Sequence, residues 1–272
     1  TIVNDLCTCG ARPVSLCMYL AVGDASYLAD GTRAGGLAAG FAQGCRQAGA
    51  IWAGGETQVL KGIVADSAAV LGGSALGRIA PKELRVRGDV QQGDAIIFLA
   101  SSGVHTNGIT LCRAVADRLP QGYLTELSDG RTFGDALLTP SLIYARFIAA
   151  CQREGMHLHC AVHLTGHGWR KLMRPAEPFV YRVDTVPEPQ PVFRCVAEAA
   201  RMDDCEAYGT FNMGAGFAVY VRAGDARRCL DCAESTGHRA WQGGTVHKEG
   251  ERKAVVIEPL GVTYEADSLQ IR

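Results

Sequence analysis

Hydrophobic positions in this chain form short runs and stripes separated by glycine-rich polar segments, a pattern typical of proteins that alternate strands and helices. The clearest run, residues 95–100, is rich in β-branched and aromatic side chains and predicts a buried strand. Residues 109–118 follow with the pattern of a helix. A stripe of apolar residues at helical spacing predicts another helix over residues 32–48, which Gly49 ends.

The other predicted elements are short and are distributed over the whole chain. Strands are expected over residues 14–22, 63–73, 156–165, 217–221 and 254–258. Helices are expected over residues 1–12, 135–151 with a break at Pro140, 192–200 and 226–235. A charged, irregular segment at residues 80–93 separates two parts, so we predict an α/β (α+β) protein with domains at residues 1–80 and 81–272.

The segment between the strand at 95–100 and the helix at 109–118 is SSGVHTNG, residues 101–108. Glycines let a loop turn tightly and let another molecule approach it, and a helix start offers free N–H groups to an anion. His105 and Asn107 carry side chains suited to proton transfer and hydrogen bonding. The alternative is an ordinary strand-to-helix turn with a surface histidine.

Two carboxylates are candidates for holding a divalent cation, because Mg²⁺ takes oxygen ligands. Asp5 lies in the predicted opening helix, and Glu56 stands between the double glycine Gly54–Gly55 and Thr57. A glycine pair followed by an acid and a hydroxyl is suited to presenting Glu56 to a metal–phosphate group. Otherwise Asp5 is a solvated helix residue and the glycines form a turn with a surface glutamate.

Four histidines and a basic segment follow one another closely. The histidines are His157, His159, His163 and His167. The first three share one face of the predicted strand, but without an acidic or thiolate partner at a defined spacing we favour one functional histidine over a metal site. Gly166–Gly168 then opens a predicted helix with three cations, which suits an anionic group or is simply a basic helix face: Arg170, Lys171 and Arg174.

Composition narrows the classes of protein that this chain can belong to. The 272 residues are 47% hydrophobic and 20% charged, with a net charge of −1, so we expect no nucleic-acid and no membrane partner. Eleven cysteines, an odd number, argue against an all-disulfide framework and suit a reducing cytosol. The one CxxC pair, Cys229 and Cys232, is weak support for zinc. The chain has no P-loop sequence, and a Rossmann nucleotide site is unsupported.

Seven segments resemble the aminoimidazole ribonucleotide (AIR) synthetase family, also called phosphoribosylformylglycinamidine cyclo-ligase. They stand here in the family's order: VNDL (3–6), GARP (10–13), FAQGCRQAGAIWAGGET (41–57), SSGVHTNG (101–108), LLTPSLIY (137–144), HLTGHG (163–168) and TFNMGAGF (210–217). The resemblance implies a cytoplasmic homodimer of two-domain subunits in which N-terminal strands close a barrel across the dimer. It also implies purine-biosynthetic ring closure of formylglycinamidine ribonucleotide, a small phosphorylated substrate, with ATP and Mg²⁺.

The resemblance also implies roles for individual residues. It assigns His105 and Asn107 to the catalytic loop and Asp5 and Glu56 to Mg²⁺. The residues expected to contact ATP are Gly54, Gly55, Glu56, Thr57, Ser102 and Gly103. Those expected to contact the substrate are Thr165, Gly166 and Gly168.

The chain departs from the family in two respects. Nothing matches the family's GTDGVGTK-like N-terminal segment, which contributes to the ATP site, so we expect an N-terminal domain that is truncated here. Residues 58–62 differ from the family sequence after GGET, and His167 replaces a glycine of the Thr-Gly-Gly-Gly loop. Two alternatives therefore stay open: a related ATP-dependent enzyme of the same superfamily with another small substrate, or a degenerate, non-catalytic paralogue.

Overall fold

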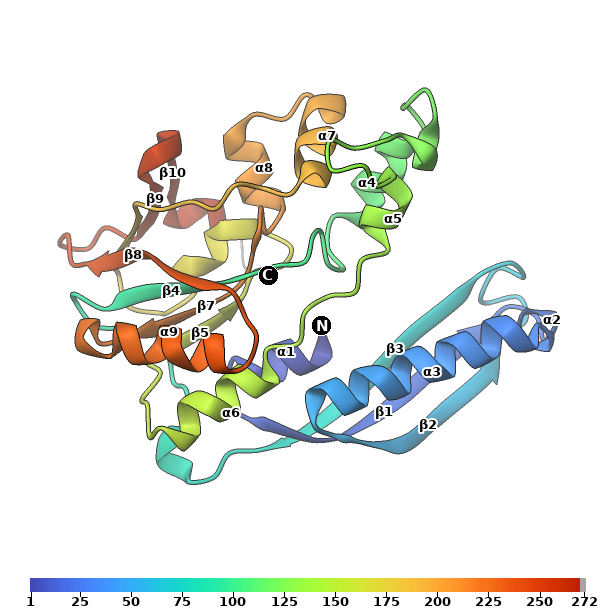
Figure 1. The fold of residues 1–272 in the computed structure, drawn as a ribbon, viewed down its shortest axis with the longest axis horizontal. Helices are drawn as coiled ribbons and strands as arrows, with labels where there is room; N and C mark the ends of the chain where they lie inside the picture. Colours follow the sequence, from blue (N-terminus) through green and yellow to red (C-terminus); the bar gives the residue numbers. More distant parts are fainter. Residues whose placement is uncertain (270–272) are drawn as a thin grey trace. The chain divides into compact units, whose positions relative to one another are not determined.

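The computed structural model describes residues 1–269, which divide into two compact units. One unit contains residues 2–85 and 143–149 and holds a sheet of three strands. The other contains residue 1, residues 86–142 and the chain from residue 150 onward, and holds a sheet of seven strands (Figure 1). We call them the three-stranded unit and the seven-stranded unit. The predicted α/β (α+β) class is confirmed.

The three-stranded sheet has its first strand in the middle. β1 (Arg12–Val22) pairs in parallel with β2 (Ile51–Val59) and antiparallel with β3 (Ala69–Arg78). The helices of this unit are α1 (Ile2–Cys7), α2 (Ser26–Ala29) and α3 (Gly31–Ala48). α3 lies along β1 and β2 (Figure 1) and ends at Gly49 in the left-handed conformation, as its sequence predicts.

The two faces of this sheet differ. Trp52 packs against Phe41 of α3, with 5.1 Å between ring centroids, so α3 covers part of one face. Ser15 pairs with Ile51 on one side and with Leu76 on the other, and directly paired side chains point to the same face. Ile51 and Leu76 are each 65% exposed. We call the face that carries them the open face.

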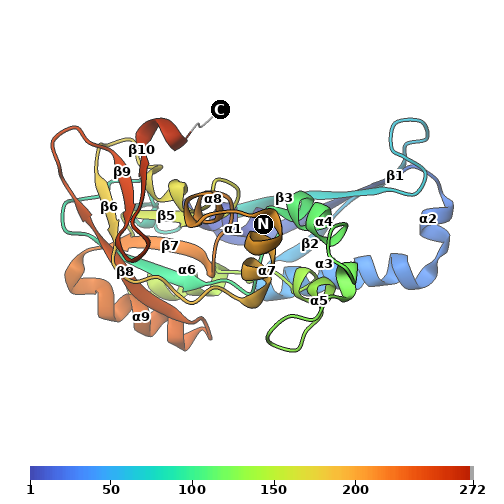
Figure 2. The ribbon, with the colours of Figure 1, turned by 90° about the horizontal axis from the view of Figure 1, so that it is seen from above.

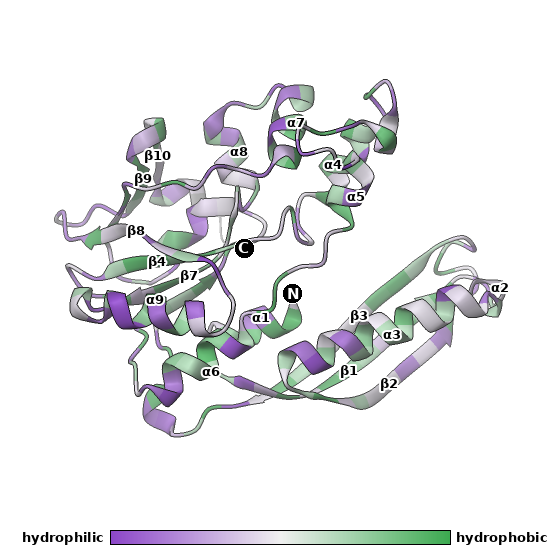
Figure 3. Ribbon diagram, viewed as in Figure 1, coloured by the Kyte–Doolittle hydropathy of each residue, from purple (hydrophilic) through white to green (hydrophobic). Residues whose placement is uncertain are grey.

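The seven-stranded sheet has the order β10-β9-β6-β8-β4-β7-β5, and its pairs are antiparallel except for β6 with β9. Its strands are β4 (Ala95–Ala100), β5 (Cys160–His163), β6 (Val180–Val183), β7 (Ala215–Val221), β8 (Ala240–His247), β9 (Ala254–Ile257) and β10 (Val262–Glu265). All residues of β7 and five of the six in β4 are buried, and both strands are strongly hydrophobic (Figure 3). These two strands form the centre of the core.

Further helices and short 3₁₀ turns lie in the rest of the chain. The helices are α4 (Ile109–Ala116), α5 (Phe133–Leu137), α6 (Ala145–Arg153), α7 (Pro191–Ala200), α8 (Asp204–Thr210) and α9 (Ala226–Ser235). The 3₁₀ turns are Lys82–Leu84, Gly122–Leu124, Gly168–Met173, Ala223–Asp225, Glu258–Leu260 and Ala266–Leu269. α9 contacts β4 and β8 (Figure 2). No helix within residues 1–269 is long and apolar enough to cross a membrane.

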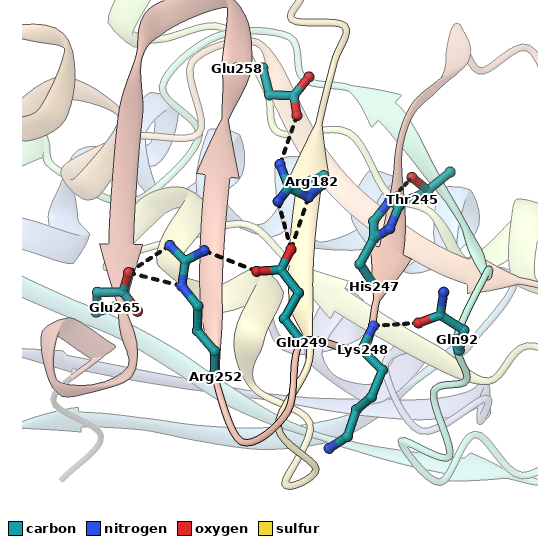
Figure 4. A network of polar contacts seen from close by, with 9 residues as sticks. All are labelled: Gln92, Arg182, Thr245, His247, Lys248, Glu249, Arg252, Glu258 and Glu265. Atoms are coloured by element: carbon teal, nitrogen blue, oxygen red, sulfur yellow. Dashed lines mark hydrogen bonds and ion pairs between the residues drawn. The ribbon is translucent and has the colours of Figure 1, made fainter.

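A chain of ion pairs ties the β6–β9–β10 edge of the large sheet together (Figure 4). Arg182 on β6 contacts Glu249 at 2.6 Å and Glu258 at 3.1 Å. Arg252 contacts Glu249 at 3.1 Å and Glu265 on β10 at 2.8 Å. Water screens these exposed groups, so the individual pairs contribute little to stability.

Several predicted elements need correction. The strand expected over 63–73 begins only at Ala69 and continues to Arg78. Gly54 and Gly55 do not form a turn but lie inside β2, where a Cβ on Gly55 would collide with the Met18 carbonyl of β1. The strand expected over 156–165 shortens to β5. The sequence pattern did not reveal β6, β8, β10 and α8.

Candidate active site

The buried side chain of Asn212 holds the loop that follows β4, residues 101–108. Its Oδ1 accepts hydrogen bonds from the Ser101 hydroxyl at 2.7 Å and the Gly214 N–H at 3.0 Å. Its Nδ2 donates to the carbonyls of Gly103 at 2.9 Å and Val104 at 3.3 Å. Asn212 is 3% exposed, so these bonds fix the loop where water cannot replace them. Sequence reasoning included its segment but assigned Asn212 no role.

A steric constraint sets the other end of the loop. Gly108 has φ 80° and precedes α4, and a Cβ there would press into the ring of Phe211. Only glycine satisfies both conditions, since other residues resist this backbone region and none fits against the ring. The loop therefore has one defined path between β4 and α4.

His105 is buried in this loop and has positive φ, 61°. Its Nε2 accepts a hydrogen bond from the Ser102 N–H at 3.2 Å, while its buried Nδ1 has no hydrogen-bond partner among the described residues. Burial, and then the nearby His163, lower the pKa of His105 to about 4. The imidazole is therefore neutral near pH 7, and because Nε2 accepts, we assign the proton to Nδ1. His105 thus offers a buried, unused N–H donor.

The loop containing His105 lies beside the glycine loop at 165–168. A Cβ on Gly166 would be 3.3 Å from Oδ1 of Asn107, so these two residues are immediate neighbours. Gly168 has φ 51°, and a Cβ there would collide with the Tyr208 carbonyl. The structure thus brings both predicted catalytic residues close to the predicted substrate loop.

Lys171 is a further candidate, one of the three cations for which the sequence left open an anion-binding role or a basic helix face. It is 8% exposed, and its ammonium donates to the Thr165 hydroxyl and, at 3.3 Å, to the His163 carbonyl. The segment Gly168–Met173 is a 3₁₀ turn, which directs Lys171 inward. Arg170 instead donates to the carbonyls of Gly209 and Ser268. A buried lysine at Thr165 places positive charge beside the glycine loop.

The histidines do not form a metal site. His157 is exposed and precedes β5, whereas the buried His159 pairs with Asp94 at 2.7 Å. His163 is the histidine that lies near His105. Within residues 1–269 no group of three or more His, Cys, Asp or Glu side chains is placed to hold a metal ion, and this includes the CxxC pair.

The residues assigned to ATP and Mg²⁺ are distributed over both units. Asp5 and Gly54–Thr57 belong to the three-stranded unit, and all are exposed. Ser102 and Gly103 belong to the seven-stranded unit, where the Ser102 hydroxyl donates to the Pro140 carbonyl at 2.7 Å. Exposed carboxylates suit Mg²⁺, which commonly binds one or two of them together with water and phosphate oxygens.

Family comparisons cover nearly the whole of this architecture. The N-terminal domain of AIR synthase related proteins matches residues 1–79, and the C-terminal domain matches residues 91–257. The chain belongs to the AIR synthase related family. The resemblance seen in its seven segments is confirmed.

Curated relatives point to one branch of this family. The chain is 36% identical over 239 residues to phosphoribosylformylglycinamidine cyclo-ligase of Methanothermobacter thermautotrophicus, covering 87% of this chain and 69% of the relative. It is 34% identical to the Methanocaldococcus jannaschii protein of the same name, covering 85% of this chain and 65% of the relative. The chain thus spans about two thirds of the length of these relatives.

Solved structures show the same fold. Hydrogenase maturation protein HypE superposes with a TM-score of 0.69 at 21% identity, covering 97% of this chain and 79% of HypE. PurL of T. maritima, complexed with ATP, superposes with a TM-score of 0.58 at 17% identity, covering 98% of this chain and 39% of PurL. At these identities the likeness concerns the fold alone.

Proposed function

We propose that this chain carries out the ATP-dependent cyclisation of formylglycinamidine ribonucleotide to aminoimidazole ribonucleotide. The observation that carries the proposal is the buried N–H donor of His105, beside the glycine loop, in a chain similar over most of its length to proteins named for this reaction. Phosphoryl transfer activates the formamide oxygen, an amidine nitrogen attacks the carbon, and phosphate leaves. Each step redistributes charge on oxygen, which positioned donors stabilise.

In this proposal His105 acts first as a hydrogen-bond donor. A neutral imidazole with its proton on Nδ1 can donate a hydrogen bond to the formamide or phosphoryl oxygen, and it needs no change of protonation state to do so. Asn107 adds an amide donor and acceptor next to Gly166. Thr165, Gly166 and Gly168 contact the phosphorylated substrate, with the Lys171 ammonium supplying charge complementary to its phosphate.

The ATP side of the proposal uses the residues that the resemblance assigns to it. We propose Gly54, Gly55, Glu56 and Thr57 as ATP contacts, and Asp5 and Glu56 as Mg²⁺ ligands that help to neutralise the phosphates. ATP-bound structures of HypE and PurL, which share the fold, support this part. For Ser102 and Gly103 to contact ATP, Ser102 must exchange its present bonds to Pro140 and His105. We also propose that the two domains comprise residues 1–80 and residues 81–272.

The test is ADP release by the full-length natural protein with Mg²⁺, ATP and formylglycinamidine ribonucleotide. We expect ADP only when the amidine substrate is present, and a fall in turnover of about 100-fold or more for His105→Ala. Thr110→Ala, a change at an exposed position of α4, serves as the control. Full activity of a folded His105→Ala variant would remove His105 from the mechanism.

The alternative is a related ATP-dependent enzyme with another small phosphorylated substrate. It is favoured by His167 in the glycine loop and by the likeness of the fold to HypE. A panel of substrate amides and amidines, measured by ADP release, separates the two functions. No ADP with any of them would favour the non-catalytic paralogue.

We also propose a cytoplasmic homodimer formed through the open face of the three-stranded unit. An apolar sheet face with Ile51 and Leu76 exposed is typical of an interface. Leu76→Glu should convert the dimer to a monomer in light scattering, because a carboxylate would be buried on association. Leu124→Glu, at an exposed leucine of the other unit, is the control. A monomeric wild-type protein would contradict the proposal.

A further inference from the structure

Three arginine side chains of the three-stranded unit line a cavity that the proposed cyclisation does not use. The cavity has a volume of about 390 Å³, and every residue around it belongs to this unit. Its charged residues are the first residue of β1, the last residue of β3 and one residue in the first turn of α6: Arg12, Arg78 and Arg146. The other lining residues are apolar or glycine, so among the described residues no carboxylate borders the cavity.

Two of these arginines are placed where their charges repel. Arg12 and Arg78 are direct partners in the antiparallel pairing of β1 with β3. Directly paired side chains point to the same face, with Cβ atoms about 5 Å apart, and like charges in such a pair are destabilising. Among residues 1–269 no carboxylate forms an ion pair with either of them. The sheet thus holds two positive charges next to each other without compensating them.

Arg146 also has an unfavourable position in the unliganded chain. It is exposed and is the second residue of α6. A cation in the first turn of a helix lies at the positive end of the helix dipole, which destabilises the helix. Within the described part of the chain Arg146 forms no ion pair either. An anion bound in the cavity would make all three positions favourable, because it would lie between the positive groups.

The size and charge of the cavity indicate a small polyanion. Its volume lies in the range of small-molecule sites, about 300–1,000 Å³. A planar guanidinium donates two parallel hydrogen bonds to a phosphate, which suits arginine to binding phosphoryl groups. One phosphate carries at most about two negative charges, which leaves one of the three arginines uncompensated. Two linked phosphates match the three cations, and the apolar side chains of Pro13 and Val14 can contact an organic group.

We propose that this cavity binds the diphosphate group of a small molecule, with Arg12 and Arg78 donating from the sheet and Arg146 from α6. Free pyrophosphate and a nucleoside diphosphate both carry this group. The site is separate from the proposed ATP contacts, since Glu56 pairs with Tyr19, seven residues after Arg12 in β1. At about 3.3 Å per residue the two positions are roughly 20 Å apart, so binding in the cavity does not depend on the proposed cyclisation.

The test measures pyrophosphate binding to the full-length natural protein by isothermal titration calorimetry, at constant ionic strength and without Mg²⁺. We expect one site per chain and an affinity at least about tenfold lower for Arg146→Gln, which loses charge-assisted hydrogen bonds. Arg33→Gln is the matched control. It removes the same charge at the start of α3, whereas the cavity contacts the end of that helix at Ala48, about 22 Å away. Equal affinities of wild type and Arg146→Gln, or an equal loss in Arg33→Gln, would overturn the site.

Titration with ADP separates the two sources of the diphosphate group. ADP that binds more tightly than pyrophosphate, and loses this affinity in Arg146→Gln, identifies a nucleoside diphosphate, whereas weaker binding of ADP identifies free pyrophosphate; either result supports the site.

A stability measurement distinguishes binding from simple screening of charge. Arg12→Gln removes the repulsion between the paired arginines, so the unliganded variant should be no less stable than wild type. Pyrophosphate should raise the melting temperature of wild type more than that of Arg12→Gln. An equal rise in both proteins, or a rise that NaCl at the same ionic strength reproduces, would overturn the site.

Discussion

Residues 101–108 and residues 54–57 are both glycine-containing segments assigned to the same reaction, yet the chain holds them very differently. The first is fixed by Asn212, by the ring of Phe211 and by the buried core around β4. The second lies on an exposed strand of the three-stranded sheet. Contacts within the chain therefore fix the loop at residues 101–108. The proposed role of residues 54–57 depends instead on the ligand that binds to them.

The largest expected effect is the loss of stability caused by Asn212→Ala, because Asn212 holds residues 101–108 in place. This change leaves the partners of four buried hydrogen bonds unsatisfied, so we expect a loss of roughly 4 kcal/mol in the free energy of unfolding. Urea denaturation measures it. Asn107→Ala, at a half-buried position of the same loop, should cost less than about 1 kcal/mol. Equal losses would mean that Asn212 does not organise the loop.

His105 should give the seven-stranded unit a pH-dependent stability. Its folded pKa, about 4, lies below its unfolded value of 6.5, so the unfolded chain binds more protons between these values. Stability therefore falls as the pH drops through this window, by up to about 3 kcal/mol for this group. His105→Gln should lose correspondingly less stability between pH 7 and pH 4 in urea denaturation. Parallel pH profiles for the two proteins would show that His105 is not held neutral by burial.

Two glycines of the seven-stranded unit allow the cost of backbone strain to be measured separately from the cost of a steric clash. Gly108 and Gly130 have similar φ, 80° and 78°, but a Cβ meets the Phe211 ring at Gly108 and nothing within 4 Å at Gly130. We expect Gly130→Ala to cost about 1 kcal/mol and Gly108→Ala roughly 3 kcal/mol. Thermal unfolding measures both. Identical losses would show that the ring yields freely and that the loop path is not sterically set.

The smallest stability effect is expected in the second segment, from Glu56→Gln. Glu56 is exposed, so the free energy of unfolding of the unliganded chain should change by less than about 0.5 kcal/mol. The shift of the melting temperature by Mg²⁺ and ATP should nevertheless decrease. An unchanged shift would remove Glu56 from the metal site, whereas a large loss without ligand would remove the contrast between the two segments.

Elements whose pattern is local were predictable from the sequence. β4 and α9 have the predicted bounds, and α3 ends at the predicted glycine. β8 was missed because Gly243 and Gly244 interrupt its pattern. These glycines are needed where the Phe98 ring and the Arg182 backbone pass closely, and such long-range contacts leave no local signal.

Some parts of the candidate site were likewise predictable from the sequence and others were not. The loops at 101–108 and 165–168 were recognisable from their glycines and polar residues. Asn212 was not, because it acts on a loop that precedes it by over a hundred residues in sequence. Lys171 was named among the cations suited to an anionic group, but its burial was not predicted, because lysine is rarely buried and the 3₁₀ turn directs it inward.

The position of β4 in the interior of its sheet has a consequence for synthesis. Both of its partners come late, since residues 95–100 pair with β7 at 215–221 and β8 at 240–245. At about 5–20 residues per second, this apolar strand waits on the order of ten seconds on the ribosome with both edges unpaired. Nascent chains of this protein are thus vulnerable to aggregation and favourable targets for a chaperone until the last third of the chain emerges.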